Sequence, residues 1–258
     1  MRITVLAENT TKHPELAAEH GLSLYVETAG HRILFDMGQS DLFYQNARRL
    51  GIDLSAVDLA ILSHGHYDHG GGLATFLEIN DRAPILLRED AFLPHYNAVG
   101  KYIGLDASLK KHPRLRFVGD VYRIDDALTL LSCNQNTRPY AVPLSGLTEE
   151  TATGRAPDRF FHEQYLCIRE NGKTVVLSGC SHKGIRNVVS WLSPDVLIGG
   201  FHTSKLPLDQ HLLSEAEALA ASPTTYYTCH CTGTEAFAYM KNVMPRLFYL
   251  STGEKILL

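Results

Sequence analysis

Short apolar runs, separated by polar or glycine-containing loops, recur along the whole chain and define its expected elements. Short runs of this kind predict buried strands, whereas longer segments with helical spacing predict amphipathic helices. Two turns, Ala29-Gly30-His31 and Asn171-Gly172, each lie between two apolar runs and predict β-hairpins. No linker separates the β-rich halves, so we expect a single α/β (α+β) domain over residues 1–258. Strands are expected at residues 2–7, 22–27, 32–35, 58–62, 84–88, 116–118, 128–131, 166–170, 174–177, 196–198 and 225–228, and helices at 41–50, 73–79, 185–191, 214–219 and 234–240.

The densest group of reactive side chains directly follows the strand expected at 58–62. It holds His64, His66, Asp68 and His69, and three glycines come after it. Imidazole suits Zn, Fe, Ni and Cu, and a carboxylate extends the choice to Mn. His64 and His66 are expected to point the same way, because side chains of an extended segment repeat every second residue. Asp68 and His69 follow the bend, so we predict a second, neighbouring metal position for them.

Three later strands are each followed by a histidine, at His182, His202 and His230. One histidine after a strand is usually a core or capping residue, but three at equivalent strand ends are better explained by one shared site. We predict His182 and His230 as metal ligands, and His202 as an acid, a base or a hydrogen-bond donor in the pocket. Asp36 also stands at a strand end, where a turn cap and a functional role are both open.

Two long segments, residues 90–113 and 134–158, lack a clear helical or strand period. Long loops in compact domains are often functional. We therefore expect both segments as insertions that can cover the site, with an ordinary surface loop and helix as the alternative for the first. Lys101 and Tyr102 in the first segment are candidate substrate contacts.

Composition and charge narrow the class of partners. The chain is 45% hydrophobic with a formal net charge of −4, which is ordinary for a globular protein and disfavours nucleic acid as a partner. Its five cysteines are odd in number and show no disulfide framework, which predicts a reduced, cytoplasmic protein. The first residues form a strand pattern rather than a signal peptide, and no apolar run approaches the roughly 20 residues of a membrane helix. We expect no membrane partner, and no pattern indicates an oligomeric state.

The HxHxDH sequence after a strand resembles the signature of the metallo-β-lactamase superfamily. The resemblance implies a four-layer αββα sandwich with one or two metals at the sheet edges, and an Asp36 that orients the metal loop. It extends over nearly the whole chain and points to one branch, the metal-dependent hydrolases of β-lactamase superfamily II. Some members of that branch are named 7,8-dihydropterin-6-methyl-4-(β-D-ribofuranosyl)-aminobenzene-5′-phosphate synthase. The further segments that carry this likeness are residues 19–23, 35–40, 179–182, 199–202 and 230–233.

The resemblance also implies how the ligands divide between two divalent ions, with Zn as the first choice and Mn or Fe as alternatives. One ion would be held by His64, His66 and His182, and the other by Asp68, His69 and His230. Most dinuclear members have a bridging aspartate where this chain has Cys180, for which a thiolate ligand and a small buried residue both stay open. With one carboxylate against two divalent ions the centre would stay cationic, which favours a phosphate- or diphosphate-bearing substrate.

We therefore predict an enzyme that acts on an anionic small molecule, with Asp68 and His202 as catalytic residues. The metals would activate water for hydrolysis, or stabilise a departing diphosphate while an arylamine attacks a dihydropterin. A metal-dependent binder or sensor without turnover is the alternative from another class. A nuclease is a third reading, against which the pI of about 6.3 argues.

Overall fold

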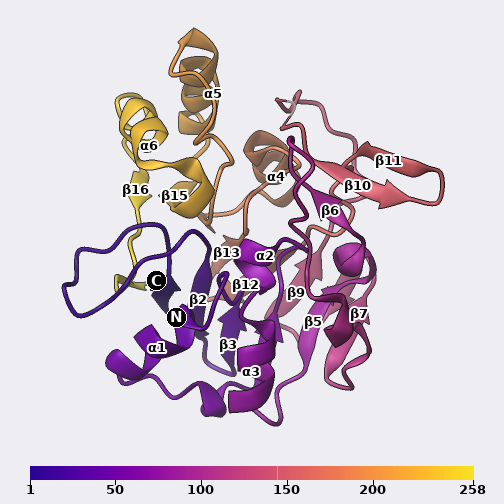
Figure 1. Cartoon of the computed structure of the whole chain (residues 1–258). Helices are drawn as coiled ribbons and strands as arrows, with labels where there is room; N and C mark the ends of the chain where they lie inside the picture. Colours follow the sequence, from indigo (N-terminus) through magenta and orange to yellow (C-terminus); the bar gives the residue numbers. More distant parts are fainter. Residues whose placement is uncertain (144) are drawn as a thin grey trace.

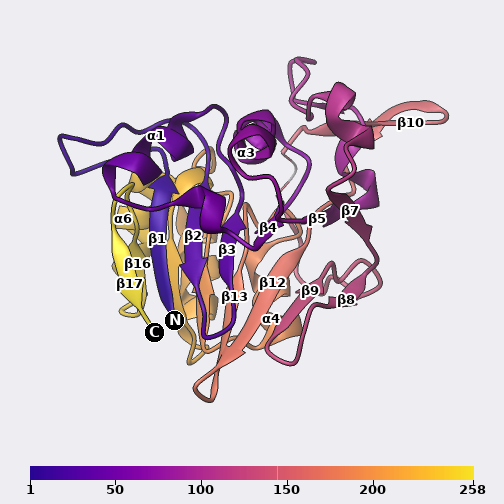
Figure 2. The same cartoon turned by 90° about the horizontal axis from the view of Figure 1, so that it is seen from below.

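The computed structural model describes residues 1–143 and 145–258; residue 144, inside the predicted lid 134–158, lies outside the described residues. Two seven-stranded sheets pack face to face, and helices cover both outer faces (Figures 1 and 2). This arrangement confirms the predicted αββα sandwich.

The first sheet has the strand order β17-β1-β2-β3-β4-β5-β7. It is antiparallel from β17 to β3 and parallel from β3 to β7. Parallel strands that are buried on both faces have continuous apolar sequences. The apolar runs of the sequence therefore predicted these strands. Its strands are β1 (Arg2–Ala7), β2 (Ser23–Glu27), β3 (Arg32–Phe35), β4 (Leu59–Ile61), β5 (Ile85–Arg88), β7 (Leu115–Val118) and β17 (Lys255–Leu257).

The second sheet has the order β16-β15-β14-β13-β12-β9-β8. Its strands β13 to β16 are parallel, and β13 to β8 are antiparallel. The predicted Asn171-Gly172 turn joins β12 to β13. The strands are β8 (Val121–Arg123), β9 (Leu128–Leu131), β12 (Tyr165–Glu170), β13 (Lys173–Leu177), β14 (Val196–Ile198), β15 (Thr225–Thr228) and β16 (Leu247–Tyr249).

Three apolar clusters hold the layers together. One fills the space between the sheets, one joins the first sheet to α1 and α3, and one joins the second sheet to α4, α5 and α6. The helices are α1 (Leu42–Arg49), α2 (Tyr67–Gly70), α3 (Leu73–Ile79), α4 (Ile185–Leu192), α5 (Gln210–Ala220) and α6 (Thr234–Lys241). Short 3₁₀ turns occur at Leu54–Ala56, Glu89–Phe92, Ala107–Lys111 and His230–Thr232.

The two predicted insertions pair with each other in a third, small sheet of order β11-β10-β6 (Figure 1). Its strands are β6 (His95–Tyr96), β10 (Thr148–Thr151) and β11 (Gly154–Pro157). The expectation that the run up to residue 158 is loop-like was therefore wrong. The hairpin β10–β11 has no apolar alternation, and its strands are defined by pairing with β6, which lies far away in the sequence.

The carboxyl ends of the parallel strands of both sheets meet at one edge of the sandwich. In the first sheet β3 leads into Asp36 and β4 into His64, and in the second β13 leads into Cys180 and β15 into His230. Sites of layered α/β folds tend to lie at such an edge. The topology therefore brings residues from both halves of the chain to one place.

All five cysteines carry free thiols. Among the described residues, no helix has the length and the apolar character that crossing a membrane requires.

His31, in the β2–β3 turn, ties the two sheets together at the end away from that edge. Its ring nitrogens lie 2.7 Å from Asp58 Oδ1 and 3.0 Å from Asp125 Oδ2. Burial acts to lower the pKa of His31, but the hydrogen bonds to the two carboxylates outweigh it, so the pKa is raised. The resulting stabilisation is complete below the unfolded pKa of about 6.5 and is lost as the pH rises through the raised folded value.

Replacing His31 with asparagine should therefore lower the free energy of unfolding at pH 5.5 by up to about 1 kcal/mol, and by less at pH 9. Urea unfolding at both pH values measures the difference, with His211→Asn on the exposed side of α5 as the control. Equal destabilisation at the two pH values would contradict a stabilising role of the protonated His31 ring.

Candidate metal centre

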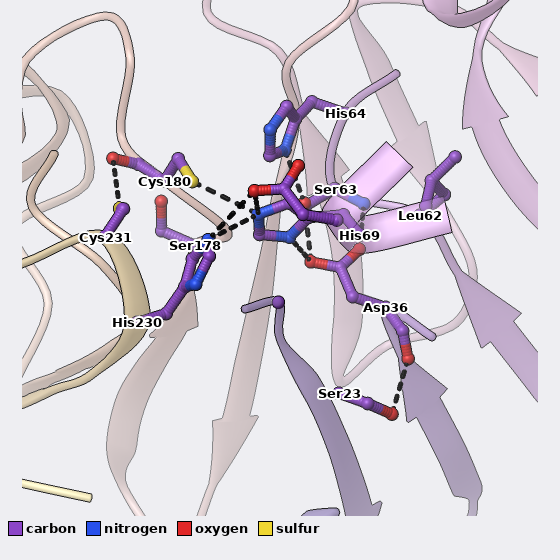
Figure 3. A network of polar contacts seen from close by, with 12 residues as sticks. Ser23, Asp36, Leu62, Ser63, His64, His69, Ser178, Cys180, His230 and Cys231 are labelled. Atoms are coloured by element: carbon purple, nitrogen blue, oxygen red, sulfur yellow. Dashed lines mark hydrogen bonds and ion pairs between the residues drawn. The ribbon is translucent and has the colours of Figure 1, made fainter. Parts of the chain in front are cut away.

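The loop that carries four of the predicted ligands is fixed by Asp36 at the end of β3 (Figure 3). The carboxylate of Asp36 is fully buried and accepts hydrogen bonds from Ser63 N–H, Ser63 Oγ and His69 Nδ1, each at 2.7 Å. Since Ser63 Oγ donates its proton to Asp36, it accepts from His64 Nδ1, 2.8 Å away. Both histidines thus carry their proton on Nδ1 and expose Nε2 as a lone pair. The expected orienting role of Asp36 is confirmed.

His64, His66 and His182 form the first group of donors. They are almost fully buried, and the nitrogens of the group lie within 4.8 Å of one another. His64 Nε2, His66 Nε2 and both ring nitrogens of His182 have no hydrogen-bond partner among the described residues. Burial holds the pKa of all three well below its usual range, so the imidazoles are neutral. Buried polar atoms without partners are costly, and a cation would satisfy them.

Asp68, His69 and His230 form the second group. His69 Nε2 lies 3.1 Å from His230 Nε2, and Asp68 Oδ2 lies 3.3 Å from His230 Nε2 and 3.9 Å from His69 Nε2. His230 Nδ1 is 2.8 Å from Asn9 Oδ1, a pure acceptor, so its proton is on Nδ1 and Nε2 is a lone pair. Two lone pairs and a carboxylate at these distances repel one another unless a positive charge lies among them.

The pKa shifts of the second group also favour a positive charge among its ligand atoms. Burial lowers the pKa of His230 to about 4. Burial opposes the ionisation of Asp68, yet the neighbouring His69 and a hydrogen bond from His20 hold the pKa of Asp68 well below its usual range. Burial likewise acts to lower the pKa of His69, but the carboxylates of Asp36 and Asp68 raise it. Asp68 is therefore ionised, and positive charge is favoured beside it.

A divalent cation fits both groups. The atoms of the second group are 3.1–3.9 Å apart, the spacing of ligands that surround one ion at about 2.0–2.2 Å. Neutral imidazoles and a carboxylate are donors that Zn, Fe and Mn accept. The structure thus brings together all six predicted ligands in the two predicted groups; that they bind metal stays a prediction.

Cys180, at the end of the β13 loop, also faces the second group (Figure 3). Its Sγ lies 3.1 Å from His69 Nε2, and the side chain is nearly fully buried. Burial raises the pKa of the Cys180 thiol well above its usual value, so without a nearby cation the sulfur keeps its proton. Its position matches a ligand and a small packing residue equally, and both readings of Cys180 stay open.

His202, the predicted acid or base, lies next to the first group. Its ring centroid is 4.4 Å from that of His182, and both rings line one end of a cavity. Burial lowers the pKa of His202, which leaves a neutral imidazole that can accept a proton. Its catalytic role stays a prediction.

A second buried cluster consists of His95, Asp158 and His162, and it contacts the ligand-bearing loop at Gly65. It was not predicted from the sequence. Gly65 N–H donates to His162 Nδ1 at 2.8 Å, so the His162 proton is on Nε2, which lies 3.3 Å from Asp158 Oδ2. Asp158 Oδ2 also accepts from His95 Nδ1 at 2.9 Å. His66 lies next to this cluster, with its Nε2 4.0 Å from Asp158 Oδ2. The tautomer makes His162 a support for the backbone between two ligands rather than a ligand.

Two further residues that contact the second group, His20 and Glu8, were not among the predicted site residues. His20 Nε2 lies 3.2 Å from Asp68 Oδ2. Glu8, fully buried after β1, accepts from His230 N–H at 2.7 Å and from Tyr249 Oη at 2.6 Å. Both residues lie in the connection between β1 and β2, and only the folded chain places them at the site.

The family model described as the metallo-β-lactamase superfamily matches residues 17–227. The chain belongs to the metallo-β-lactamase superfamily. The match spans the loop with the first four predicted ligands and also His182, while His230 lies just beyond its end.

Known relatives within the superfamily match over nearly the full chain. An uncharacterized protein of Methanocaldococcus jannaschii is 30% identical, covering 93% of this chain and 94% of the relative. The crystal structure of Tm1679, a metal-dependent hydrolase of the β-lactamase superfamily, superposes with a TM-score of 0.87 at 31% identity, over 100% of this chain and 99% of that one. The 7,8-dihydropterin-6-methyl-4-(β-D-ribofuranosyl)-aminobenzene-5′-phosphate synthase of M. jannaschii is 26% identical over 85% of this chain and 83% of its own length. These likenesses confirm the family that the motifs indicated.

Replacing Asp36 with asparagine should weaken metal binding by about 10- to 100-fold, the usual cost of removing an outer partner of a ligand. The amide would present N–H groups to Ser63 and His69, so His69 would shift its proton to Nε2 and lose the lone pair. Asparagine tolerates the left-handed φ of 59° at this position, so the backbone can be kept. Metal content after dialysis against a chelator series measures the effect, with Asp81→Asn on the surface as the control. Unchanged metal affinity would refute the tautomer argument.

Proposed function

We propose that the chain is a metal-dependent hydrolase that acts on an anionic, phosphate- or diphosphate-bearing small molecule. One observation supports the proposal most directly: His69 Nε2 and His230 Nε2 lie 3.1 Å apart, beside the Asp68 carboxylate. The unpartnered nitrogens of His64, His66 and His182 nearby support a second cation position.

In this proposal His64, His66 and His182 hold one divalent ion, and Asp68, His69 and His230 hold the other, with Zn preferred over Mn or Fe. Bound ions would polarise a substrate oxygen and lower the pKa of a water molecule. Asp36, Ser63 and Asn9 keep the ligand lone pairs aimed inward. His202, at the cavity wall beside His182, would take up or supply a proton at the leaving group.

The preference for an anionic substrate rests on charge. Asp68 is the single carboxylate among the six proposed ligands, and the residue that faces the second group from the β13 loop is Cys180 rather than a carboxylate. Two divalent ions against one carboxylate leave a strongly positive centre, which attracts phosphate groups. The net charge of −4 supports a small molecule over a nucleic acid.

A second candidate is transfer rather than hydrolysis: an arylamine would displace diphosphate from a dihydropterin. The 26% identity to the M. jannaschii synthase over most of both chains favours this reading. The same site would serve, with positive charge stabilising the diphosphate as it leaves.

Metal analysis of the purified protein, followed by assays with phosphomonoesters, phosphodiesters and diphosphates in the presence of Zn, Mn or Fe, tests the proposal. Release of phosphate that stops after chelation and returns with metal is the expected result. Product formed only when an arylamine accompanies a dihydropterin diphosphate would establish transfer instead. Tight ligand binding without any product would contradict both enzyme proposals and would indicate a metal-dependent binder or sensor.

A further inference from the structure

A cavity of about 190 Å³ lies beside the candidate metal centre, and no proposed ligand except His182 contributes to its wall. His182 and His202 line one end of it. The remaining wall comes mainly from residues 140–143, 145 and 147 of the second insertion, the start of α4, the loop after β14, and α5, with Met240 of α6. Most of these side chains are apolar, so the cavity needs a different explanation from the polar centre next to it.

One side of the cavity is flat and held rigid. The backbone of Tyr140 is clamped by Asn187, whose side chain accepts from its N–H at 3.0 Å and donates to its carbonyl at 2.9 Å. The Arg186 guanidinium lies over the Tyr140 ring, 3.9 Å from its centroid. Arg186 is also fixed by Glu215, 2.8 Å away. Two stacked planar groups thus form a preorganised wall.

The charge left over at this cavity is positive. Arg186 and Glu215 neutralise each other, whereas Lys205 forms no ion pair with any described residue. The other titratable side chains that line the cavity are Tyr140 and three histidines, His182, His202 and His211. This balance suits a ligand whose apolar body carries a negative group at the end near His202.

We propose that the cavity binds an aromatic ring of the substrate, whose anionic group then reaches the metal centre; this rests on the proposed function. An apolar cavity of about 150 Å³ is enough to hold a benzene ring, so 190 Å³ admits one ring with a small substituent. The Tyr140–Arg186 stack offers the flat partner that a ring prefers. Leu206 and Leu212 contribute further apolar wall.

Phenylphosphonate and methylphosphonate are suitable probes, because they share the anionic group and differ in the ring. With metal-loaded protein, calorimetry should show phenylphosphonate binding at least about tenfold more tightly, from burial of the ring. Butylphosphonate, which is apolar but not flat, should fall clearly below phenylphosphonate. Equal affinity of the butyl and phenyl compounds would overturn the assignment to an aromatic body.

Two variants fill the cavity from different walls, Leu206→Trp from the loop after β14 and Val142→Trp from the lid. Each should bring the phenyl-to-methyl affinity ratio close to one while methylphosphonate binds as before; thermal melting checks that both fold. A ratio near one in the unaltered protein, or a ratio retained in the folded variants, would overturn the cavity assignment and leave the proposed function intact. If methylphosphonate fails to bind the metal-loaded protein, the proposed function fails, and the assignment with it.

Discussion

His66→Ala protein is expected to lose one bound metal ion and all measurable turnover. His66 Nε2 is buried without a partner and belongs to the donor group with His64 and His182. Removing a ligand should weaken metal binding by more than the roughly 10- to 100-fold typical of outer partners. Alanine also leaves space beside His162, whose ring centroid is 5.2 Å from that of His66. Elemental analysis and steady-state kinetics on the same preparation measure both losses.

Asp68→Asn provides the matched test in the second donor group, because it keeps the size of the side chain and removes its charge. It should reduce affinity for the other ion and leave His69 and His230 facing each other without a carboxylate. Asp81→Asn, on the exposed surface and outside both the metal centre and the cavity, is the control for both variants. Full metal content and activity in a folded His66→Ala or Asp68→Asn protein would rule out the proposed ligand set.

Gly65→Ala is expected to be as damaging as loss of a ligand, although Gly65 has no side chain to contribute. A Cβ at this position would overlap the carbonyl group of Ala91 and lie 2.9 Å from its Cα. Ala91 is buried, so the loop between His64 and His66 must shift instead. Overpacking of this kind costs about 1–3 kcal/mol or more. The shift would also break the hydrogen bond from Gly65 N–H to His162 Nδ1.

Gly30→Ala is the matched control, because a Cβ at Gly30 meets no atom within 4 Å. It should change the free energy of unfolding by less than about 0.5 kcal/mol. Thermal melting and metal content distinguish the two variants: we expect a lower melting temperature and substoichiometric metal only for Gly65→Ala. Equal melting temperatures would contradict the expected overlap between a Cβ at position 65 and Ala91.

The sheets and the donor groups could be predicted because their signals are local. The apolar runs of β3, β4 and β13 are short, buried and bounded by glycine or polar residues, so they read directly as strands. The alternation of His64 and His66 on an extended segment placed their side chains on one side. Histidines at the ends of parallel strands then had to meet, because such ends share one edge.

The cluster of His95, Asp158 and His162 could not be predicted, because its residues come from distant parts of the sequence. Asp158 and His162 lie in a polar stretch without a period, and His95 comes from the other insertion. The pairing of β6 with β10 and the positive φ of 57° at Phe160 accompany their approach, and neither is visible in the sequence pattern. The same applies to Glu8, which contacts His230 only after both sheets have formed.

The three-stranded sheet β11-β10-β6 makes the two insertions a single transplantable module. Thr148 and Glu149 of β10 pair with Tyr96 and His95 of β6. The Arg155 guanidinium adds a second link, 3.5 Å from the centroid of the Tyr96 ring. A chimera that received only residues 134–158 from a relative would set that relative's β10, and its residue at position 158, against this chain's own β6 and His95. Selectivity should therefore be exchanged between relatives only by grafting both segments together.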